Sequence, residues 1–371
     1  MRAMLATWCV VMAVSRVWGG GLPAIQAVFV IVLENHNWSD VKGNTNAPYL
    51  NQILLPLAAY CEQYYNPPGL HPSLPNYLWL EAGTNFGIYD DNPPAVNHQN
   101  TRAHLTALLD CAGITWKAYA EDISGTGVPL VGTNSYTPRH NPFVYFDDVT
   151  GTNTPGCAWG IAHIRPYSEL ASDLTNNTVA RYNFIIPNVC DDGHDACPPW
   201  YNPILWSDAW LSNEVPKILA SAAYRNAGAL FVLWDEGASG SDGPLGLLLL
   251  SPAGRCGGYP SGVHRTHSSF LRTLQEIFGV SPFLGDAANA TDLGDLFVSY
   301  GFRRVLRQND GRVELTAMGV TPGRTNVILA APDLADWAPI GTNCAVSDSF
   351  IYVDNCTTNL GCRFYRLQQL P

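Results

Sequence analysis

Four short, mainly apolar runs constrain the fold of this 371-residue chain more than any other feature. The runs cover residues 27–33, 182–186, 229–234 and 245–250. Short runs of this kind, rich in branched residues, are typical of strands buried on both faces of a parallel sheet. Helical patterns lie between them, at 49–59, 103–111, 208–223 and 269–278. The alternation predicts an α/β fold in which a mainly parallel sheet carries helices on both faces.

The composition is that of a compact globular chain. Hydrophobic residues make up 47% and charged residues 14% of the sequence, which argues against disorder and against a coiled coil. The formal net charge of −11 gives no general attraction for polyanions, so nucleic acid is not expected as a specific partner. A phosphate group would therefore have to be bound by a local cation, such as a metal ion.

The first 21 residues have the plan of a secretory signal peptide. Arg2 precedes an apolar run at 3–14, and small residues follow at 19–21. A membrane anchor is the alternative interpretation, but the run is shorter than the ~20 apolar residues that a spanning helix needs, and Arg16 interrupts the segment. We therefore expect a protein that is secreted or periplasmic.

The ten cysteines suit an oxidising compartment. Zinc ligation is the competing interpretation, but no pair has the C-x2-C spacing, so disulfides are favoured. We expect a disulfide between Cys190 and Cys197. A further bridge is expected among Cys344, Cys356 and Cys362, near the end of the chain.

Oxygen-bearing side chains follow two of the predicted strands. Glu34 and Asn35 come directly after the run 27–33, and Asp235 and Glu236 come directly after the run 229–234. Ligands in α/β folds gather outside the carboxyl ends of the strands, so two such ends can meet. Taken alone, each pair is more typical of turn residues or helix caps. Together, carboxylate and amide oxygens predict a site for a divalent metal ion such as Mg, Mn, Ca or Zn.

Ser73 lies between two prolines, in the segment 71–77 that leads into a helical pattern. A serine at a helix N-terminus can simply be a cap. It can also be a nucleophile, because the helix dipole and the free N–H groups there stabilise an anion. Beside a divalent cation, this hydroxyl would be activated by coordination rather than by a His–Asp relay.

Six motifs occur in one order between about residues 28 and 297. They are ENHN (34–37), HPSLPNY (71–77), WKAYAED (116–122), RHNPF (139–143), DGHD (192–195) and WDEG (234–237). In this order they resemble the phosphoesterase family of secreted acid phosphatases and bacterial phospholipases C, part of the alkaline-phosphatase-like superfamily of metal-dependent phosphate-ester hydrolases. Six ordered motifs are far more specific than any one of them.

The resemblance implies a metal site and a nucleophile. The implied metal ligands are Glu34, Asn35, Asp235 and Glu236, and the implied nucleophile is Ser73. Acid-phosphatase relatives can carry a second Asp at the last of these ligand positions, so the longer Glu236 would shift the ion or leave Asp235 as the main ligand.

The resemblance also implies two catalytic histidines. His140 and His194 match family histidines near the phosphoryl group, where they would steady its oxygens or protonate the leaving alkoxide. The sequence does not separate these two roles. Lys117, Glu121 and Asn141 are candidate substrate-binding residues, although the pattern 116–120 fits ordinary strand packing equally well.

The remaining histidines have a simpler interpretation. For five of them a structural hydrogen-bonding role is favoured: His36, His71, His98, His104 and His163. His267 is undecided, because relatives carry a similar His-Ser stretch while helix capping also explains the serines.

The pattern changes after residue 297. Short alternating stretches at 313–317, 326–330, 350–353 and 363–367, separated by turn signals, predict a small all-β module at 301–371. The catalytic domain is then expected at 22–300. The module resembles small β-sandwich-like modules of secreted bacterial enzymes, and a passive stabilising role is favoured over contact with a glycan or a surface.

The leading functional hypothesis is a secreted, metal-dependent phosphomonoesterase of the acid-phosphatase type that forms a phosphoserine at Ser73. A phospholipase C that acts on head groups at a phospholipid surface is the first alternative. Family phospholipases tend to be longer, with more β modules and a twin-arginine signal, whereas this chain has one module and a lone Arg2. The second alternative, a non-catalytic secreted binding protein, is supported only by Glu236.

Overall fold

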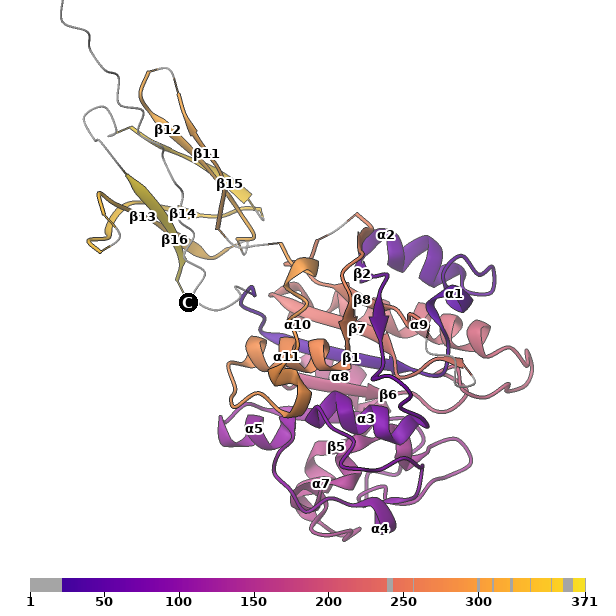
Figure 1. Ribbon diagram of the computed structural model, residues 1–371. Coiled ribbons are helices and arrows are strands. Elements are labelled where there is room, and N and C mark those ends of the chain that lie inside the picture. Colours follow the sequence, from indigo (N-terminus) through magenta and orange to yellow (C-terminus); the bar gives the residue numbers. More distant parts are fainter. Residues whose placement is uncertain are drawn as a thin grey trace, which may run out of the picture. The chain divides into compact units, whose positions relative to one another are not determined.

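The computed structural model describes residues 22–238, 243–255, 257–298, 301–308, 310–320, 323–333, 335–347, 349–355 and 363–370. The predicted signal peptide lies outside the described residues, as do Cys356 and Cys362. The chain divides into two compact units, one from Ala24 to Phe297 and one that contains the residues from Val298 onward (Figure 1). The two units are considered separately below.

A mainly parallel sheet forms the centre of the first unit. Among the described residues it has eight strands in the order β5-β4-β6-β1-β7-β8-β2-β9. Their bounds are β1 (Ala27–Leu33), β2 (Ala59–Cys61), β4 (Trp116–Ala120), β5 (Ile164–Pro166), β6 (Tyr182–Ile186), β7 (Gly228–Trp234), β8 (Leu247–Leu250) and β9 (Tyr259–Ser261). The central strand β1 pairs in parallel with both β6 and β7. Every residue of β1, β6 and β7 is buried, as their apolar sequences predict.

Strand β8 departs from the parallel pattern. It corresponds to the predicted run 245–250, but it pairs antiparallel with both β7 and β2. A parallel connection needs a crossover of a dozen or more residues, usually a helix. The sequence predicts no helix between the runs 229–234 and 245–250 that could make such a crossover. Strand β8 therefore runs beside β7 in the opposite direction.

Helices cover both faces of this sheet (Figure 1). One group of packed helices consists of α3 (Ser73–Ala82), α5 (Leu105–Cys111) and α11 (His267–Phe278), and another consists of α8 (Leu170–Asn176), α9 (Pro203–Ala220) and α10 (Ala222–Arg225). Shorter elements are α1 (Trp38–Val41), η1 (Leu50–Leu54), α2 (Leu55–Leu57), α4 (Pro94–Asn97), η2 (Pro138–His140), η3 (Pro142–Tyr145), α6 (Asp147–Thr150), α7 (Ala158–His163), η4 (Tyr167–Glu169), η6 (Gly285–Ala288) and η7 (Gly294–Leu296), with a two-stranded pair of β3 (Tyr64–Tyr65) and β10 (Arg265–Thr266). The predicted α/β class is therefore confirmed.

Helix α3 is held tightly at its C-terminal end. Gly83 terminates it with a φ of 66°, in the left-handed region that glycine adopts without steric cost. A Cβ atom at this position would come within 2.4 Å of the backbone oxygen of Leu284. This position therefore requires glycine both for its backbone angle and for its space.

The second unit is an all-β module. One antiparallel sheet contains β11 (Gly301–Arg307), β12 (Val313–Met318) and β15 (Ser349–Asp354), and the other contains β14 (Ala338–Cys344), β13 (Thr325–Ala331) and β16 (Phe364–Gln369). Apolar residues from both sheets share one core, among them Leu315, Ile328 and Tyr365. The predicted all-β character is confirmed. Within the described part of the chain Cys344 is a free thiol.

Candidate functional site

The site begins where β1 and β7 end. These neighbouring strands are in register, with Leu33 opposite Trp234, so Glu34 and Asp235 leave the sheet side by side. Both carboxylates are fully buried. The backbone N–H of Asn35 donates to Asp235 Oδ1 over 3.3 Å, and Asn35 has a φ of 42°, a left-handed conformation that Asn tolerates better than most residues. The predicted meeting of the two strand ends is thus present.

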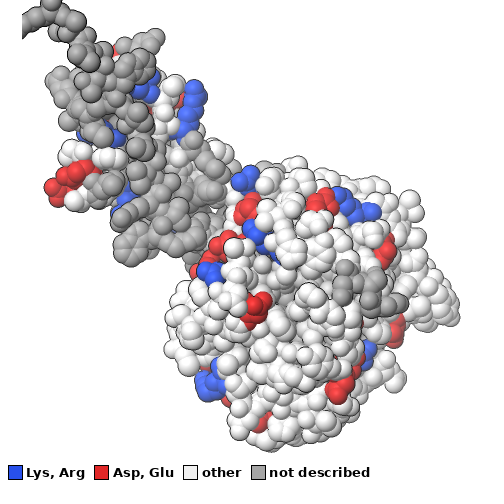
Figure 2. All heavy atoms as spheres, in the orientation of Figure 1, with Lys and Arg blue, Asp and Glu red and all other residues white. Residues whose placement is uncertain are grey.

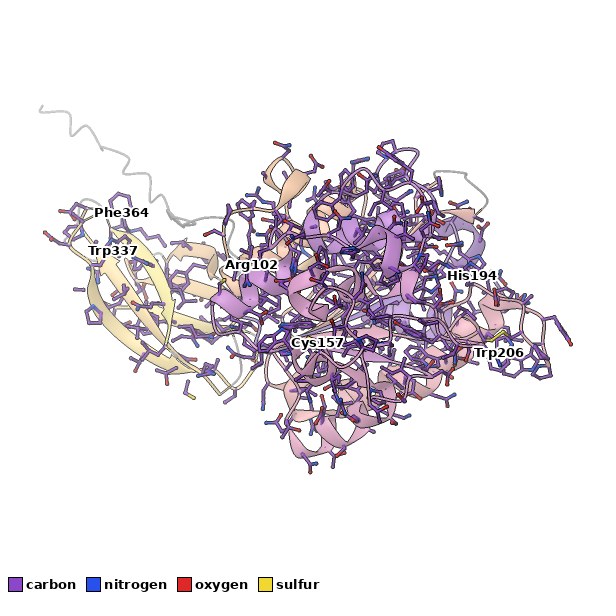
Figure 3. The ribbon with its side chains drawn as sticks, turned by 90° about the horizontal axis from the view of Figure 1, so that it is seen from below. Arg102, Cys157, His194, Trp206, Trp337 and Phe364 are labelled. Carbon is purple, nitrogen blue, oxygen red and sulfur yellow. A yellow bond between two sulfur atoms is a disulfide. The ribbon has the colours of Figure 1, made fainter. Side chains whose placement is uncertain are left out.

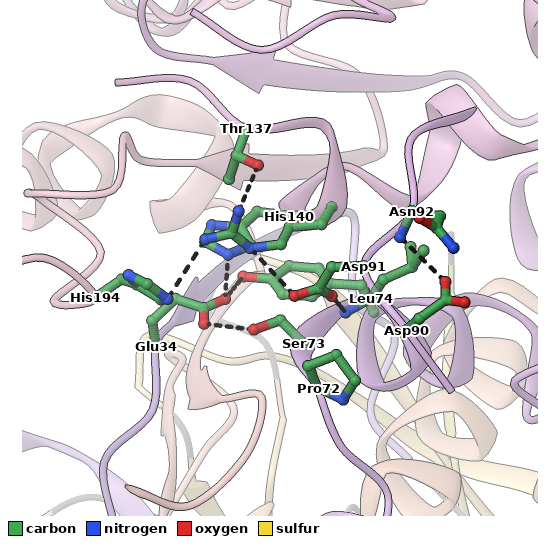
Figure 4. Close-up of polar contacts among 12 residues, drawn as sticks. Glu34, Pro72, Ser73, Leu74, Asp90, Asp91, Asn92, Thr137, His140 and His194 are labelled. Carbon is green, nitrogen blue, oxygen red and sulfur yellow. Dashed lines mark hydrogen bonds and ion pairs between the residues drawn. The ribbon is translucent and has the colours of Figure 1, made fainter. Parts of the chain in front are cut away.

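Ser73 is the first residue of α3, and its hydroxyl points into this cluster. Ser73 Oγ donates to Glu34 Oε2 over 3.0 Å (Figure 4). The N-cap residue of this helix is Pro72, which makes no side-chain cap hydrogen bond. Asp91 binds that end instead, because its Oδ1 accepts from the backbone N–H of Leu74 over 2.9 Å. The geometry therefore leaves the Ser73 hydroxyl available for chemistry and gives the capping role to another residue.

Tyr77 is a site residue that the sequence interpretation missed. It follows Ser73 by four residues on α3, so the two side chains share one face of the helix. Its hydroxyl donates to Glu34 Oε1 over 2.6 Å, and its ring stacks on His140 with 5.3 Å between centroids. Both oxygens of the Glu34 carboxylate are thus held by one helix. The spacing of four between Ser73 and Tyr77 was the available signal.

His140 lies at the end of η2 and is buried beside two carboxylates. Its Nδ1 lies 2.9 Å from Asp192 Oδ2, and its Nε2 lies 3.2 Å from Glu34 Oε1. Burial, reinforced by the charges of Arg139 and His194, lowers the pKa of His140 well below its usual value. The imidazole is therefore neutral, and the Asp192 carboxylate favours the tautomer with the proton on Nδ1.

His194 lies on a loop that the Cys190–Cys197 disulfide closes, and this predicted disulfide is confirmed. Asp192, on the same loop, accepts from the backbone N–H of His194 over 2.8 Å. The imidazole of His194 is partly exposed, and its Nδ1 lies 2.7 Å from Asp195 Oδ1. Figure 3 shows His194 with the disulfide and Trp206 nearby. His194 is thus the more solvent-accessible of the two predicted catalytic histidines.

Glu236 is directed away from Asn35 and toward α3 and the segment before it. Its Oε2 accepts from Asn76 Nδ2 over 3.1 Å and lies 2.6 Å from His71 Nδ1. The longer side chain reaches this segment, whereas Asp235 stays beside Asn35. Among the residues that the structure describes, the buried Asp235 Oδ2 has no hydrogen-bond partner. Of the two residues, Asp235 is therefore the one with a buried oxygen left for a ligand.

The residues at the strand ends fit a divalent metal ion. One terminal atom of the Asn35 amide lies 2.7 Å from Glu34 Oε2 and 3.3 Å from Asp235 Oδ1. With the amide nitrogen there it donates to both carboxylates, and with the oxygen there it is a third ligand for a cation. Burial, with the neighbouring carboxylates, raises the pKa of Glu34 well above its usual value, and burial raises that of Asp235 to about 7. A cation among these oxygens would offset their repulsion, and hard oxygen donors are the ligands that divalent ions prefer.

A second set of ligand atoms overlaps the first. Glu34, His140 and Asp192 lie close enough together to share one ion. Both oxygens of Asp192 already accept hydrogen bonds, from His140 Nδ1 and from the backbone of His194. We therefore interpret Asp192, which the sequence interpretation did not single out, as the residue that orients His140.

Two of the three candidate substrate-binding residues contact other parts of the fold. Lys117 Nζ lies 2.6 Å from Asp173 on α8. Glu121 accepts from Trp210 Nε1 over 2.8 Å and from the backbone of Asn188 over 2.9 Å, and burial raises its pKa to about 7. The structure does not bring either residue into contact with Ser73.

Asn141, the third candidate, follows His140 directly. It is buried, and its Nδ2 donates to the Tyr136 hydroxyl over 3.1 Å. Its Oδ1 has no hydrogen-bond partner. Asn141 thus lies next to the site, and its buried Oδ1 is available to accept a hydrogen bond.

The other histidines mostly have structural partners. His98 and His104 pair with Asp147 and Asp148, as a structural interpretation predicts. The undecided His267 lies at the start of α11, where its Nε2 is 2.6 Å from the backbone oxygen of Asp235. It therefore supports the backbone of the site from outside.

Comparison with known proteins gives a family and several relatives. The profile described as the Phosphoesterase family matches residues 46–242. A phosphatidylinositol-3-phosphatase of Mycobacterium tuberculosis is 28% identical over 295 residues, which cover 80% of this chain and 90% of that protein. A probable acid phosphatase of Kluyveromyces lactis is 26% identical over 220 residues, 57% of this chain and 48% of that protein.

Solved structures are similar at the level of the fold. One structure belongs to the metabolism of multiple glycosaminoglycans by Bacteroides thetaiotaomicron. It has a TM-score of 0.50 and 10% identity, and the match covers 88% of this chain and 89% of that one. A Vibrio parahaemolyticus protein of the alkaline phosphatase superfamily has a TM-score of 0.48 and 12% identity, covering 82% and 78%. In the part of this chain that the structure describes, no helix is both long and apolar enough to cross a membrane.

Proposed function

This chain belongs to the Phosphoesterase family and is a phosphoric ester hydrolase, and we propose that it is a metal-dependent phosphomonoesterase that forms a phosphoserine at Ser73. One observation carries the proposal. The Ser73 hydroxyl, at the N-terminus of a ten-residue helix, is hydrogen-bonded to the buried carboxylate of Glu34, beside Asn35 and Asp235. A nucleophile, a helix N-terminus and a set of metal-type ligands thus converge on one point.

The choice of a monoester as substrate is supported by the relatives. They are named a phosphatidylinositol-3-phosphatase and acid phosphatases. An enzyme with either name removes a terminal phosphate group, so the same reaction class is proposed for this chain. The alcohol that leaves is not specified by these names, and it stays open in the proposal.

The first half of the reaction is the transfer of the phosphoryl group to Ser73. Glu34 orients the hydroxyl through its hydrogen bond to Oγ, so that Oγ can approach phosphorus opposite the leaving alkoxide. A divalent ion bound by Glu34, Asn35 and Asp235 would supply positive charge to the phosphoryl oxygens and to the serine oxygen. The bond from Oγ to phosphorus forms as the bond to the leaving oxygen breaks, and the hydroxyl proton passes to Glu34 Oε2, from which it returns to Oγ when phosphoserine is hydrolysed.

We assign the proton transfer to His194 rather than to His140. His140 is buried and held as a neutral imidazole between Asp192 and Glu34, so it has no proton to give from Nε2. His194 is partly exposed and can exchange protons with solvent. It would protonate the leaving alkoxide, and in the second half it would take a proton from the water that attacks phosphoserine.

The location and the organisation of the chain complete the proposal. We propose that residues 1–21 direct secretion or export to the periplasm, and the Cys190–Cys197 disulfide is compatible with an oxidising compartment. The proposed catalytic domain covers 22–300, and the module at 301–371 has a passive stabilising role.

The test compares p-nitrophenyl phosphate with p-nitrophenylphosphorylcholine as substrates of the purified chain. We expect hydrolysis of the monoester, loss of activity after chelation, and its return with one divalent metal. Ser73→Ala should be inactive, and acid quench of the wild type should trap phosphoserine on the peptide that contains Ser73.

Other outcomes would redirect the assignment. Preference for the choline diester would favour a phospholipase C. Silence on both substrates, with and without metals, would favour a binding protein. Full activity of Ser73→Ala would remove the proposed nucleophile.

A further inference from the structure

Arg139 precedes His140 in η2, and the proposed reaction gives it no role. Its side chain is one-quarter exposed. The guanidinium donates to Thr137 Oγ1 over 3.0 Å, approaches His194 Nε2 at 3.4 Å and lies 3.6 Å from Asp91 Oδ2 (Figure 4). The last two distances exceed the 2.7–2.9 Å that is usual for a charge-assisted hydrogen bond. The guanidinium therefore keeps donor capacity for a further acceptor.

These contacts place the positive charge of Arg139 at the rim of the site. Asp91, its acidic neighbour, also binds the backbone N–H of Leu74, the residue directly after Ser73. On the other side, His194 belongs to the loop whose Asp192 binds His140. Arg139 thus lies between Asp91, which binds the N-terminus of α3, and His194.

The charge of Arg139 also acts at the centre of the site. It adds to the effect of burial in lowering the pKa of His140, and it partly offsets the rise that burial causes in the pKa of Asp192. The surroundings are otherwise acidic, with Glu34, Asp192 and Asp235 fully buried and the whole chain at −11. A phosphate group that enters such a site is repelled unless cations offset the negative charge.

We propose that Arg139 binds the phosphate of the substrate and makes the enzyme prefer monoesters to diesters. A phosphate monoester carries about −1.5 to −2 charges at pH 7, because its second pKa is about 6. A diester carries one negative charge and has one oxygen fewer to accept hydrogen bonds. The planar guanidinium can donate to two phosphate oxygens of either ester, but its positive charge attracts the dianion more strongly than the singly charged diester, so the monoester gains more from it.

This inference rests on the proposed function, and the experiment separates the two. Wild type, Arg139→Met and Arg139→Lys are assayed with p-nitrophenyl phosphate and with bis(p-nitrophenyl) phosphate, which share one leaving group. Arg102→Met is the matched control, since the Arg102 side chain is 62% exposed and its ion pair is with Asp148. Melting temperatures are measured for every variant.

Arg139→Met should lower kcat/KM for the monoester about 10- to 100-fold, as expected for the loss of one hydrogen bond to a charged group. Its kcat/KM for the diester should change little. Arg139→Lys should fall between wild type and Arg139→Met, because lysine keeps the charge without the fork of donors. Arg102→Met should match wild type on both substrates.

Binding of inorganic phosphate is the second measurement, and it needs no turnover. Calorimetry on the metal-loaded chain should give a dissociation constant that Arg139→Met raises by a factor similar to that seen for the monoester. Equal losses on monoester and diester would overturn the inference in favour of a structural role, and so would unchanged kinetics. A wild type that hydrolyses neither substrate would overturn the proposed function, and phosphate affinity would then decide the inference alone.

Discussion

Glu81 gives the clearest quantitative test of the fold around the site. It lies on α3, fully buried, and the Tyr182 hydroxyl donates to its Oε1 over 2.8 Å. Burial raises the pKa of Glu81 from its ordinary value of 4.5 to about 8. The folded protein therefore carries this side chain as the neutral acid over most of the physiological pH range.

The sign of the pH dependence follows from this difference. Below pH 4.5 the side chain is protonated in both states, and it gives no pH dependence. Between pH 4.5 and about 8 only the unfolded chain ionises, so the free energy of unfolding falls as the pH rises. At about 1.36 kcal/mol for each pH unit, the loss over this interval is about 5 kcal/mol. That is a large share of the roughly 5–15 kcal/mol by which domains are stable.

The perturbation is Glu81→Gln, which keeps the shape of the side chain and cannot ionise. Urea unfolding of both proteins between pH 4 and pH 9, followed by tryptophan fluorescence, gives the difference in unfolding free energy. This difference should shift toward the Gln variant steadily between about pH 4.5 and pH 8 and level off above. A difference that does not change with pH would refute the reasoning, since it would mean that Glu81 ionises equally in both states.

Two further predictions concern the site. Tyr77→Phe keeps the ring that stacks on His140 but loses the hydrogen bond to Glu34, so calorimetry should show about 10- to 100-fold weaker metal binding. Tyr182→Phe, the control, removes a similar buried hydroxyl elsewhere and should leave the metal affinity unchanged. Equal metal affinities in wild type and both variants would contradict the role of Tyr77. Replacing both Cys190 and Cys197 by serine should lower the free energy of unfolding by about 2–3 kcal/mol, because the disulfide no longer closes a short loop in the unfolded chain. An unchanged urea midpoint would contradict this prediction.

The parts of the site that the sequence predicted are those set by local pattern. Buried apolar runs mark parallel strands, and residues that follow such strands meet at one edge of a sheet. This is why Glu34, Asn35 and Asp235 could be grouped before the fold was known. The role of Ser73 at a helix start also follows from its own neighbourhood. The direction of β8 did not, since an apolar run is equally compatible with a parallel and an antiparallel strand.

The residues that were missed depend on contacts between distant segments. Asp192 acts on His140 across 52 positions, and nothing near either residue in the sequence announces the pair. Lys117 was predicted as a possible substrate-binding residue, but the alternating pattern around it is equally compatible with a lysine that only packs within the fold. Its partner is Asp173, 56 positions away, and only the folded arrangement of β4 and α8 decides between them.

Helix α3 makes the site adjustable from a distance. It carries the nucleophile at its first residue, and at its other end Gly83 is pressed against the backbone of Leu284. At 1.5 Å per residue these ends are about 15 Å apart. Any side chain at position 83 would force either the Leu284 segment or the end of α3 to shift, and a shift of α3 would move Ser73, Asn76 and Tyr77 together. Evolution could thus retune the geometry of the reaction by substitutions that never touch the substrate.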